Sequence, residues 1–232
     1  MRLKKWDELP ENMKTEEVRG YYEILERKKG NLILKRCFDI IVSLGMLIML
    51  SPVFLFLAIA IKLDSSGPVF YRQERVTQYG EVFRIFKFRT MVQNADKGAH
   101  ITVGNDPRIT RVGKVIRKFR LDEISQLLDV LRGTMSFVGT RPEAVRYVKQ
   151  YTPEMMATLL LPAGITSEAS IRYKDEDRML ADAENPEQVY IEKVLPEKMK
   201  YNIKGIEEFN FWTDIRTMFR TLLVVIGKNV AE

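Results

Sequence analysis

Residues 40–61 read IIVSLGMLIMLSPVFLFLAIAI, a run of twenty-two residues without a charged side chain. At about 1.5 Å of rise per residue, a helix of that length extends roughly 30 Å, which is the thickness of the hydrocarbon core of a bilayer. The run is therefore long enough to cross a membrane, and it decides the kind of fold to expect.

Ser51 and Pro52 interrupt this run near its middle. Proline removes a helix hydrogen bond and disfavours helical geometry at the residue before it, so we expect a kink or break here. Lysine and arginine residues flank both ends, and positive residues prefer the cytoplasmic side of a membrane. A re-entrant helix-break-helix hairpin, with both ends cytoplasmic, satisfies this rule. A plain single-pass anchor with a tolerated proline is the alternative, and the residues alone do not choose between them.

The composition excludes several classes of protein. The chain has 232 residues, of which 46% are hydrophobic and 29% charged, as in a globular protein with one catalytic or binding unit. The single cysteine, Cys37, permits no internal disulfide, and the single histidine, His100, has no partner for a histidine-based metal cluster. A serine hydrolase would depend on His100, which lies in a polar stretch expected to be a surface loop.

The net charge of +6 is unevenly distributed. Residues 62–120 hold thirteen Lys or Arg against five Asp or Glu, whereas residues 121–232 hold fourteen against eighteen. A cationic middle suits a partner with phosphate groups: nucleic acid, anionic lipid or a nucleotide-type substrate. Because a nucleic-acid binder needs a surface free of bilayer, the apolar run at 40–61 argues against nucleic acid.

Helical patterns lie on both sides of the apolar run. Thr15 is a predicted N-cap, and Gly30-Asn31 is expected to end the helix that it starts. Residues 112–120 place apolar side chains on one face with basic residues around them. Such an amphipathic helix lies flat on anionic lipid or packs on a protein core.

The rest of the chain predicts little sheet. Residues 69–71 and 82–88 indicate a small strand pair, residues 124–132 a helix ended by Gly133, and residues 209–226 a second apolar helix. The expected fold class is therefore α+β and mostly α-helical.

Two neighbouring carboxylates, Asp122 and Glu123, stand just before the helical pattern that begins at Ile124. The simplest role for Asp122 is an N-cap. The chemical alternative uses the same position, since the helix dipole keeps a carboxylate ionised, as a nucleophile or magnesium ligand must be. Adjacent carboxylates repel one another, so such a pair implies a cation or a phosphate-bound metal between them.

Three cationic residues are candidates for binding phosphate. Lys87 and Arg89 fall on one face if residues 87–90 are extended, and this spacing suits two phosphates. Arg141 is presented by the rigid turn Gly139-Thr140-Arg141-Pro142.

Taken in order, these motifs make the chain similar to a known family. Between residues 34 and 226 it resembles the monotopic phosphoglycosyl transferases, the bacterial sugar transferases that start capsule, O-antigen, exopolysaccharide or glycoprotein glycan synthesis on polyprenyl phosphate. The motifs that carry the resemblance are Lys35-Arg36-Cys37-Phe38-Asp39 with Ser51-Pro52, Ser66-Gly67-Pro68-Val69-Phe70, Gln73-Glu74-Arg75, Phe86-Lys87-Phe88-Arg89-Thr90-Met91, Leu121-Asp122-Glu123 with Gln126-Leu127, and Met135-Ser136-Phe137-Val138-Gly139-Thr140-Arg141-Pro142-Glu143.

The resemblance implies a two-step reaction. Asp122 would attack the phosphorus of a UDP-sugar that bears the sugar, releasing UMP, and polyprenyl (undecaprenyl) phosphate would then attack the aspartyl phosphosugar. Mg²⁺ is expected at Glu123 and Asp122, between the protein and the diphosphate. Lys87, Arg89 and Arg141 would hold the phosphates.

The same resemblance implies an arrangement at the membrane. Residues 1–36 would be an N-terminal amphipathic segment, 37–62 a re-entrant hairpin, and 63–232 a cytosolic transferase domain. The protein would lie on the cytoplasmic face of the bacterial inner membrane, against phospholipid, with both termini cytoplasmic. The resemblance is compatible with a homodimer.

The sequence departs from the family pattern in two places. Thr140 replaces the first proline of Gly-Pro-Arg-Pro, and residues 162–177 lack the usual Pro-Gly-Ile-Thr-Gly continuation. Arg172 and Lys174 are candidate replacements for a lost phosphate contact, but residues 168–177 are charged and predict an acidic surface loop. Donor choice is expected to depend on this segment, so the sugar cannot be inferred. The alternative to an enzyme is a non-catalytic, membrane-anchored scaffold that binds anionic lipid and a protein partner.

Overall fold

The computed structural model describes residues 1, 3–93, 95, 106–176, 180 and 185–227. His100 and the end of the predicted acidic loop lie outside these residues. The first half contains η1 (Trp6–Glu8), η2 (Glu11–Met13), α1 (Glu16–Arg27), α2 (Lys29–Met49), α3 (Ser51–Asp64), β1 (Phe70–Val76), η3 (Gln78–Gly80), β2 (Val82–Phe88) and α4 (Arg111–Lys118). The second half contains η5 (Leu121–Gln126), α5 (Leu127–Arg132), β3 (Met135–Val138), α6 (Val145–Val148), η6 (Met155–Leu160), β4 (Ala163–Thr166), α7 (Glu168–Arg172), α9 (Pro186–Val189), η7 (Tyr190–Val194), α10 (Leu195–Glu207) and α11 (Phe211–Val225).

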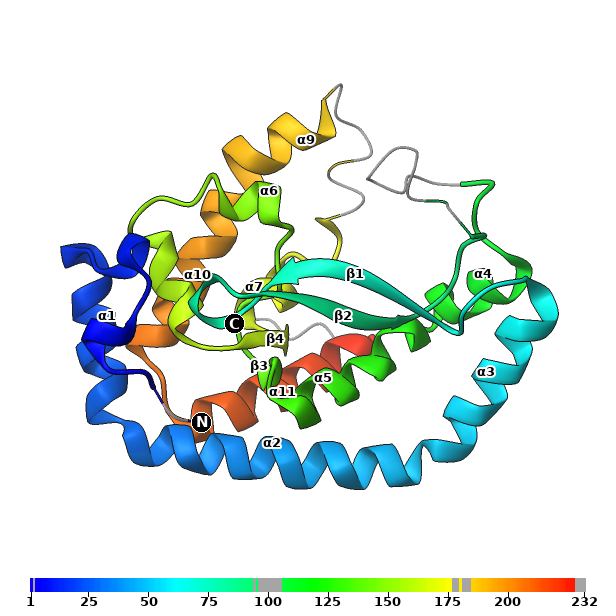
Figure 1. Cartoon of the computed structure of the whole chain (residues 1–232), viewed down its shortest axis with the longest axis horizontal. Coiled ribbons are helices and arrows are strands. Elements are labelled where there is room, and N and C mark those ends of the chain that lie inside the picture. The colour runs from blue at the N-terminus through cyan, green and yellow to red at the C-terminus, as the bar shows by residue number, and fades with distance from the viewer. Residues whose placement is uncertain (2, 94, 96–105, 177–179, 181–184, 228–232) are drawn as a thin grey trace.

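The predicted α+β, mostly helical class is confirmed. Figure 1 shows α2 running along one side of the molecule, with α3 turning up at its end and the two small sheets above them. The sheets together contain four strands, and helices supply most of the remaining ordered chain.

The apolar run breaks where proline predicts a break. Helix α2 ends at Met49 and α3 begins at Ser51, with an angle of 60° between them. Pro52 stands in the first turn of α3, where its missing N–H has no helical partner to lose. No single helix in the described chain is both long and apolar enough to span a bilayer, whereas the bent pair together meets that length and composition test.

The bent pair has one covered face and one exposed apolar face. Leu57 and Ile61 are buried against the body, while Ile41, Ile48 and Phe56 are each more than 65% exposed. An exposed apolar surface of this kind is typical of a membrane or protein interface.

The N-terminal helix confirms one predicted boundary and corrects the other. Thr15 caps α1 by accepting a hydrogen bond from the backbone N–H of Val18 at 3.4 Å. The predicted stop at Gly30-Asn31 is wrong, because α1 already ends at Arg27 and both residues lie inside α2. Helix α2 also continues through the expected boundary between residues 36 and 37, so the N-terminal segment and the hairpin share one helix.

The first sheet agrees with the prediction and extends beyond it. Strands β1 and β2 pair antiparallel from Phe70↔Phe88 to Val76↔Val82, so β1 is longer than the expected residues 69–71. The second sheet is unforeseen: β3 and β4 pair in parallel, and Gly139, the residue after β3, lies against Gly164 of β4. A Cβ on Gly164 would lie 2.1 Å from the Gly139 nitrogen, so this crossing requires glycine.

Two basic residues of α2 attach the helix to the body. Lys35 Nζ lies 2.5 Å from Asp214 Oδ2 of α11 and donates to the Val138 carbonyl at 2.8 Å. Arg36 donates to the carbonyls of Val130 and Leu131 near the C-terminus of α5, at 2.7 and 2.9 Å. A cation at this position satisfies terminal carbonyls and complements the helix dipole.

The remaining predicted helices are present with adjusted details. Helix α11 covers most of the expected residues 209–226, and α4 covers most of 112–120. The single apolar face expected for α4 is divided, because Ile116 is buried while Val115 and Phe119 are exposed. The predicted acidic loop at 168–177 begins instead as helix α7, capped by Ser167.

Candidate active site

Asp122 and Glu123 lie in η5, a 3₁₀ helix that directly follows α4. Arg120 turns the chain into it with a left-handed φ of 52°. Ser125 Oγ donates to the Phe86 carbonyl at 3.0 Å and holds η5 against β2. The interpretation of Asp122 as an N-cap is wrong, because the N-cap position belongs to Arg120 and Asp122 lies in the first turn.

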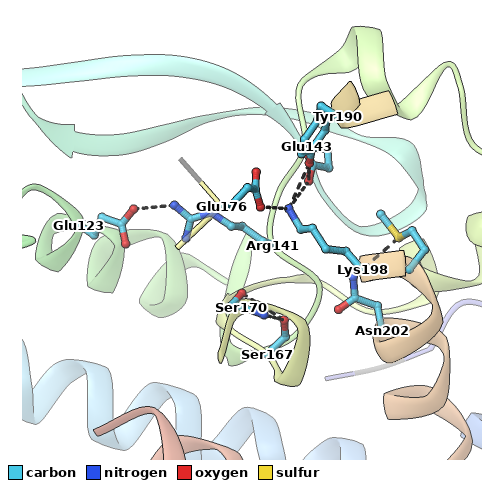
Figure 2. Close-up of polar contacts among 10 residues, drawn as sticks. Glu123, Arg141, Glu143, Ser167, Ser170, Glu176, Tyr190, Lys198 and Asn202 are labelled. Atoms are coloured by element: carbon cyan, nitrogen blue, oxygen red, sulfur yellow. Dashed lines mark hydrogen bonds and ion pairs between the residues drawn. The ribbon is translucent and has the colours of Figure 1, made fainter. Parts of the chain in front are cut away.

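Glu123 is the anionic centre of the site. Arg141 donates to Glu123 Oε1 at 2.7 Å, and Lys87 Nζ lies 3.5 Å from the same oxygen. Figure 2 shows Arg141 extending toward Glu123 from the segment that follows β3. The structure thus brings together four of the predicted residues, Lys87, Asp122, Glu123 and Arg141.

Burial and neighbouring charges determine the pKa values of Glu123, Arg141 and Lys87. Burial alone would raise the pKa of Glu123, but Arg141 and Lys87 outweigh it and lower the pKa to about 2. In return, Glu123 raises the pKa of Arg141. Burial is the largest effect on Lys87 and lowers its pKa, although Glu123 opposes this shift. Glu123 is therefore a fixed negative charge that holds two cations in place.

Asp122 has a different environment from its neighbour. Burial raises its pKa, the charge of Glu123 adds to this effect, and Lys87 and Arg117 oppose it. The expectation that a helix terminus would favour the charged form is not met, because desolvation is the largest effect. Among the described residues, no salt bridge to Asp122 is formed, whereas Glu123 forms two.

Arg89 does not join the carboxylates, contrary to the expectation that it shares a phosphate-binding face with Lys87. Strand β2 ends before it, and its buried guanidinium donates to the carbonyls of Ser65 and Ser66, each at 2.7 Å. Gly67 makes room for this contact, since a Cβ there would lie 2.1 Å from an Arg89 nitrogen. Arg89 thus ties the end of α3 to the sheet.

The two candidates from the altered segment form no ion pair with Asp122 or Glu123 among the described residues. Arg172 pairs with Glu168 at 3.1 Å and lies over the ring of Tyr201 at 4.9 Å, so its contacts are with α7 and α10. Lys174 is exposed. A phosphate-binding role for either residue stays a prediction without support from the geometry.

One family of known proteins matches most of the chain. The family described as "Bacterial sugar transferase" matches residues 30–228. The chain belongs to this family. Family membership favours an enzyme over the non-catalytic scaffold, and it confirms the resemblance drawn from the motifs.

Curated members of the family have more specific names. The chain is 36% identical over 197 residues to a UDP-N-acetylgalactosamine-undecaprenyl-phosphate N-acetylgalactosaminephosphotransferase of Aeromonas hydrophila, covering 83% of this chain and 44% of the relative. It is 36% identical over 197 residues to a UDP-glucose:undecaprenyl-phosphate glucose-1-phosphate transferase of Escherichia coli, covering 83% and 40%. An undecaprenyl-phosphate galactose phosphotransferase of Salmonella typhimurium is 31% identical over 220 residues, covering 88% and 43%. The chain thus spans less than half the length of these relatives.

The site contains a further cation, Arg75, to which the sequence interpretation gave no role. Arg75 lies on β1 two residues from Gln73 and four from Tyr71, so these side chains share one face of the strand. Tyr71 is the cross-strand partner of Lys87, which places Arg75 on the same side of the sheet as the carboxylates. Its positive charge lowers the pKa of Lys87, after larger effects from burial and other charges. Strand alternation with the correct register would have found it.

Arg117 is a second residue that was missed. It donates to Thr90 Oγ1 at 2.9 Å from α4, and its charge lowers the pKa of Asp122. The sequence interpretation assigned it only to the polar side of an amphipathic helix.

The carboxylate pair is the candidate position for a metal ion. Within the described ranges, no group of three or more His, Cys, Asp or Glu side chains is arranged to hold an ion. Carboxylates combined with substrate phosphate oxygens are, however, ligands that Mg²⁺ takes in nucleotide sites. Asp122 and Glu123 supply carboxylate oxygens of this kind.

Proposed function

We propose that this chain transfers a sugar 1-phosphate from a UDP-sugar to polyprenyl (undecaprenyl) phosphate and releases UMP. The observation that carries the proposal is that the two adjacent carboxylates have different contacts. Glu123 is engaged by Arg141 and Lys87, whereas Asp122 is half-buried beside them with no salt bridge among the described residues. The names of the relatives supply the donor and acceptor classes.

The reaction proceeds in two displacements at one phosphorus. A carboxylate oxygen of Asp122 attacks the phosphorus that bears the sugar, and the P–O bond to UMP breaks, so UMP leaves with the bridging oxygen. A phosphate oxygen of the prenyl carrier then attacks the aspartyl phosphosugar, and the carboxylate of Asp122 is released. The product is a polyprenyl diphosphate sugar, and the glycosidic C–O bond stays intact throughout. Dividing the transfer lets a water-soluble donor and a lipid acceptor use one pocket in turn.

The cations of the site bind the transferring group. Arg141 and Lys87 donate charge-assisted hydrogen bonds to the phosphate oxygens that accumulate charge during each displacement. Glu123 fixes both donors before substrate arrives, which limits the reorganisation needed in the transition state. Arg75 is placed to add a third positive charge on the sheet side of the site.

Asp122 and Glu123 would hold Mg²⁺ together with the donor diphosphate. The ion would neutralise phosphate charge that otherwise repels a carboxylate nucleophile. Glu123 would share its oxygens between the ion and Arg141.

We also propose that residues 37–62 form a re-entrant hairpin on the cytoplasmic face of the bacterial inner membrane, with both termini cytoplasmic and residues 63–232 in the cytosol. The 60° break, the exposed apolar face of α2 and α3, and basic flanks support this arrangement. Phe119, the residue after α4, is exposed next to Lys118, a combination that suits lipid head groups. The site would then lie at the depth of the prenyl phosphate.

The test is a nucleotide-release screen. Purified protein is mixed with undecaprenyl phosphate, Mg²⁺ and a series of UDP-sugars, beginning with the glucose, galactose and N-acetylgalactosamine donors named for the relatives. We expect UMP from one donor and no turnover by Asp122→Asn. Release of UDP would contradict phosphoglycosyl transfer. Asp122→Asn with undiminished turnover would contradict the proposed nucleophile.

A further inference from the structure

A buried ionic cluster lies next to Arg141 on the side away from Glu123. Lys198 of α10 has its Nζ 2.9 Å from Glu176 Oε2 and 3.5 Å from Glu143 Oε1, and its side chain is 5% exposed. Tyr190 Oη donates to Glu143 at 2.5 Å and accepts from Lys198 at 3.1 Å. Figure 2 shows these contacts beside the Arg141–Glu123 pair.

The cluster is connected to the site through a short and rigid segment. Only Pro142 separates Arg141 from Glu143, and its ring fixes φ between them. The Glu143 carbonyl accepts from the Val76 N–H at 2.9 Å, which binds this segment to the end of β1. The guanidinium of Arg141 and the buried carboxylate of Glu143 are therefore carried by one short segment that is anchored to β1.

The charges of the cluster also act on Arg141. Two carboxylates and one ammonium group leave a net charge of −1, and Glu143 and Glu176 both contribute to raising the pKa of Arg141, after the larger effect of Glu123. Without Lys198, both carboxylates would lose the ammonium group that they pair with. Arg75 already interacts with Glu143, and Arg141 would be the other cation available to the two carboxylates. A guanidinium drawn toward Glu143 or Glu176 would leave Glu123 and the phosphate position.

The helical segment that carries Tyr190 and Lys198 is irregular at Tyr190. A π-helical turn, η7, begins at Tyr190 and joins α9 to α10. Such turns are rare and occur frequently at functional sites. Tyr190 packs on Tyr147 with ring centres 4.8 Å apart, so its hydroxyl is held toward Glu143.

We propose that Lys198 is a positioning residue for sugar-phosphate transfer: it holds Glu143 and Glu176 and so leaves Arg141 free to bind Glu123 and the donor diphosphate. The proposal rests on the proposed function and adds a residue outside the site itself.

The first experiment measures UMP release at low donor concentration in Lys198→Met, Lys198→Arg and Lys200→Met. Lys200 is the matched control, since it lies on the same helix but forms an exposed pair with Glu197. Because small displacements of binding groups are costly, we expect Lys198→Met to lower kcat/KM for the donor by about tenfold or more. Lys198→Arg should restore most of this loss, and Lys200→Met should match the wild type. Equal kcat/KM in Lys198→Met and Lys200→Met overturns the proposal.

The second experiment shows whether Lys198 acts through Arg141. In an Asp122→Asn background, which we expect not to turn over, the Kd for UDP with Mg²⁺ is measured with Lys198→Met, Arg141→Met, both or neither. We expect the effect of Lys198→Met to disappear once Arg141 is absent. Additive losses overturn the proposal. If near-ultraviolet circular dichroism shows that Lys198→Met is unfolded, Tyr190→Phe replaces it in both experiments. Failure of the wild type to release UMP would refute the proposed function, whereas a wild type that turns over with no coupling refutes only the role of Lys198.

Discussion

Replacing Glu123 by glutamine tests the electrostatics of the site through stability. Glutamine has the shape of the protonated acid, so the variant approximates wild type with Glu123 neutral. Folding lowers the pKa of Glu123 from its ordinary value of about 4.5 to about 2, and this difference corresponds to about 3 kcal/mol, since a tenfold change in an equilibrium constant is roughly 1.4 kcal/mol. The side chain of Arg141 is 39% exposed. Because water screens part of its attraction, we expect a loss of about 2 kcal/mol at neutral pH.

Because folding lowers the pKa of Glu123, the direction in which stability changes with pH can be predicted. A carboxylate whose pKa is lowered on folding contributes stability above its unfolded value of about 4.5, and that contribution is lost as pH falls toward about 2. The free energy of unfolding should therefore differ between wild type and Glu123→Gln at pH 7, and the two curves should converge below pH 4.5. Denaturant titrations in detergent at a series of pH values measure this difference. A gap that persists unchanged down to pH 3 would refute the reasoning.

Three further substitutions test other parts of the structure. Gly164→Ala places a Cβ against the backbone of Gly139, so we expect thermal unfolding to show a lower Tm. Gly205→Ala is the control, because Gly205 lies in open space on α10, and it should raise Tm slightly. Equal effects of the two substitutions on Tm would contradict the close crossing. Arg75→Met should raise KM for the UDP-sugar, and Arg72→Met, on the other face of β1, should not; matched values would exclude Arg75 from donor binding. Lys35→Met leaves a buried carboxylate without its cation and should cost about 3 kcal/mol of unfolding free energy, and a loss below 1 kcal/mol would show that the pair is dispensable.

Local signals in the sequence predicted the elements that depend on local chemistry. Thr15 caps α1 and Pro52 separates α2 from α3, because capping and the missing proline N–H act within one helical turn. Gly133 ends α5 with a φ of 89°, which glycine adopts without strain. Gly30 misled the prediction because it lies in open space on α2, where a helix tolerates glycine at modest cost.

Local sequence patterns did not predict the features that depend on contacts between distant parts of the chain. Strands β3 and β4 are four residues each and pair across more than twenty residues of chain, so neither has a recognisable pattern by itself. Lys87 and Arg89 look equivalent in sequence, yet the carbonyls of Ser65 and Ser66 engage only Arg89. Its role depends on where α3 ends, which spacing within the motif does not reveal.

Asp122 lies in the first turn of η5 and not at the predicted N-cap position, and this difference matters for the proposed reaction. An N-cap uses its carboxylate oxygens to accept backbone N–H groups, and those oxygens are then unavailable to a phosphorus atom. A 3₁₀ helix has three residues per turn, so neighbouring side chains point about 120° apart. Placing the pair inside η5 therefore sends Glu123 to Arg141 and Lys87 while Asp122 takes another direction, with no salt bridge among the described residues. The same short helix, which the sequence did not predict, thus separates a carboxylate that pairs with two cations from one that forms no salt bridge among the described residues, as the proposed nucleophile requires.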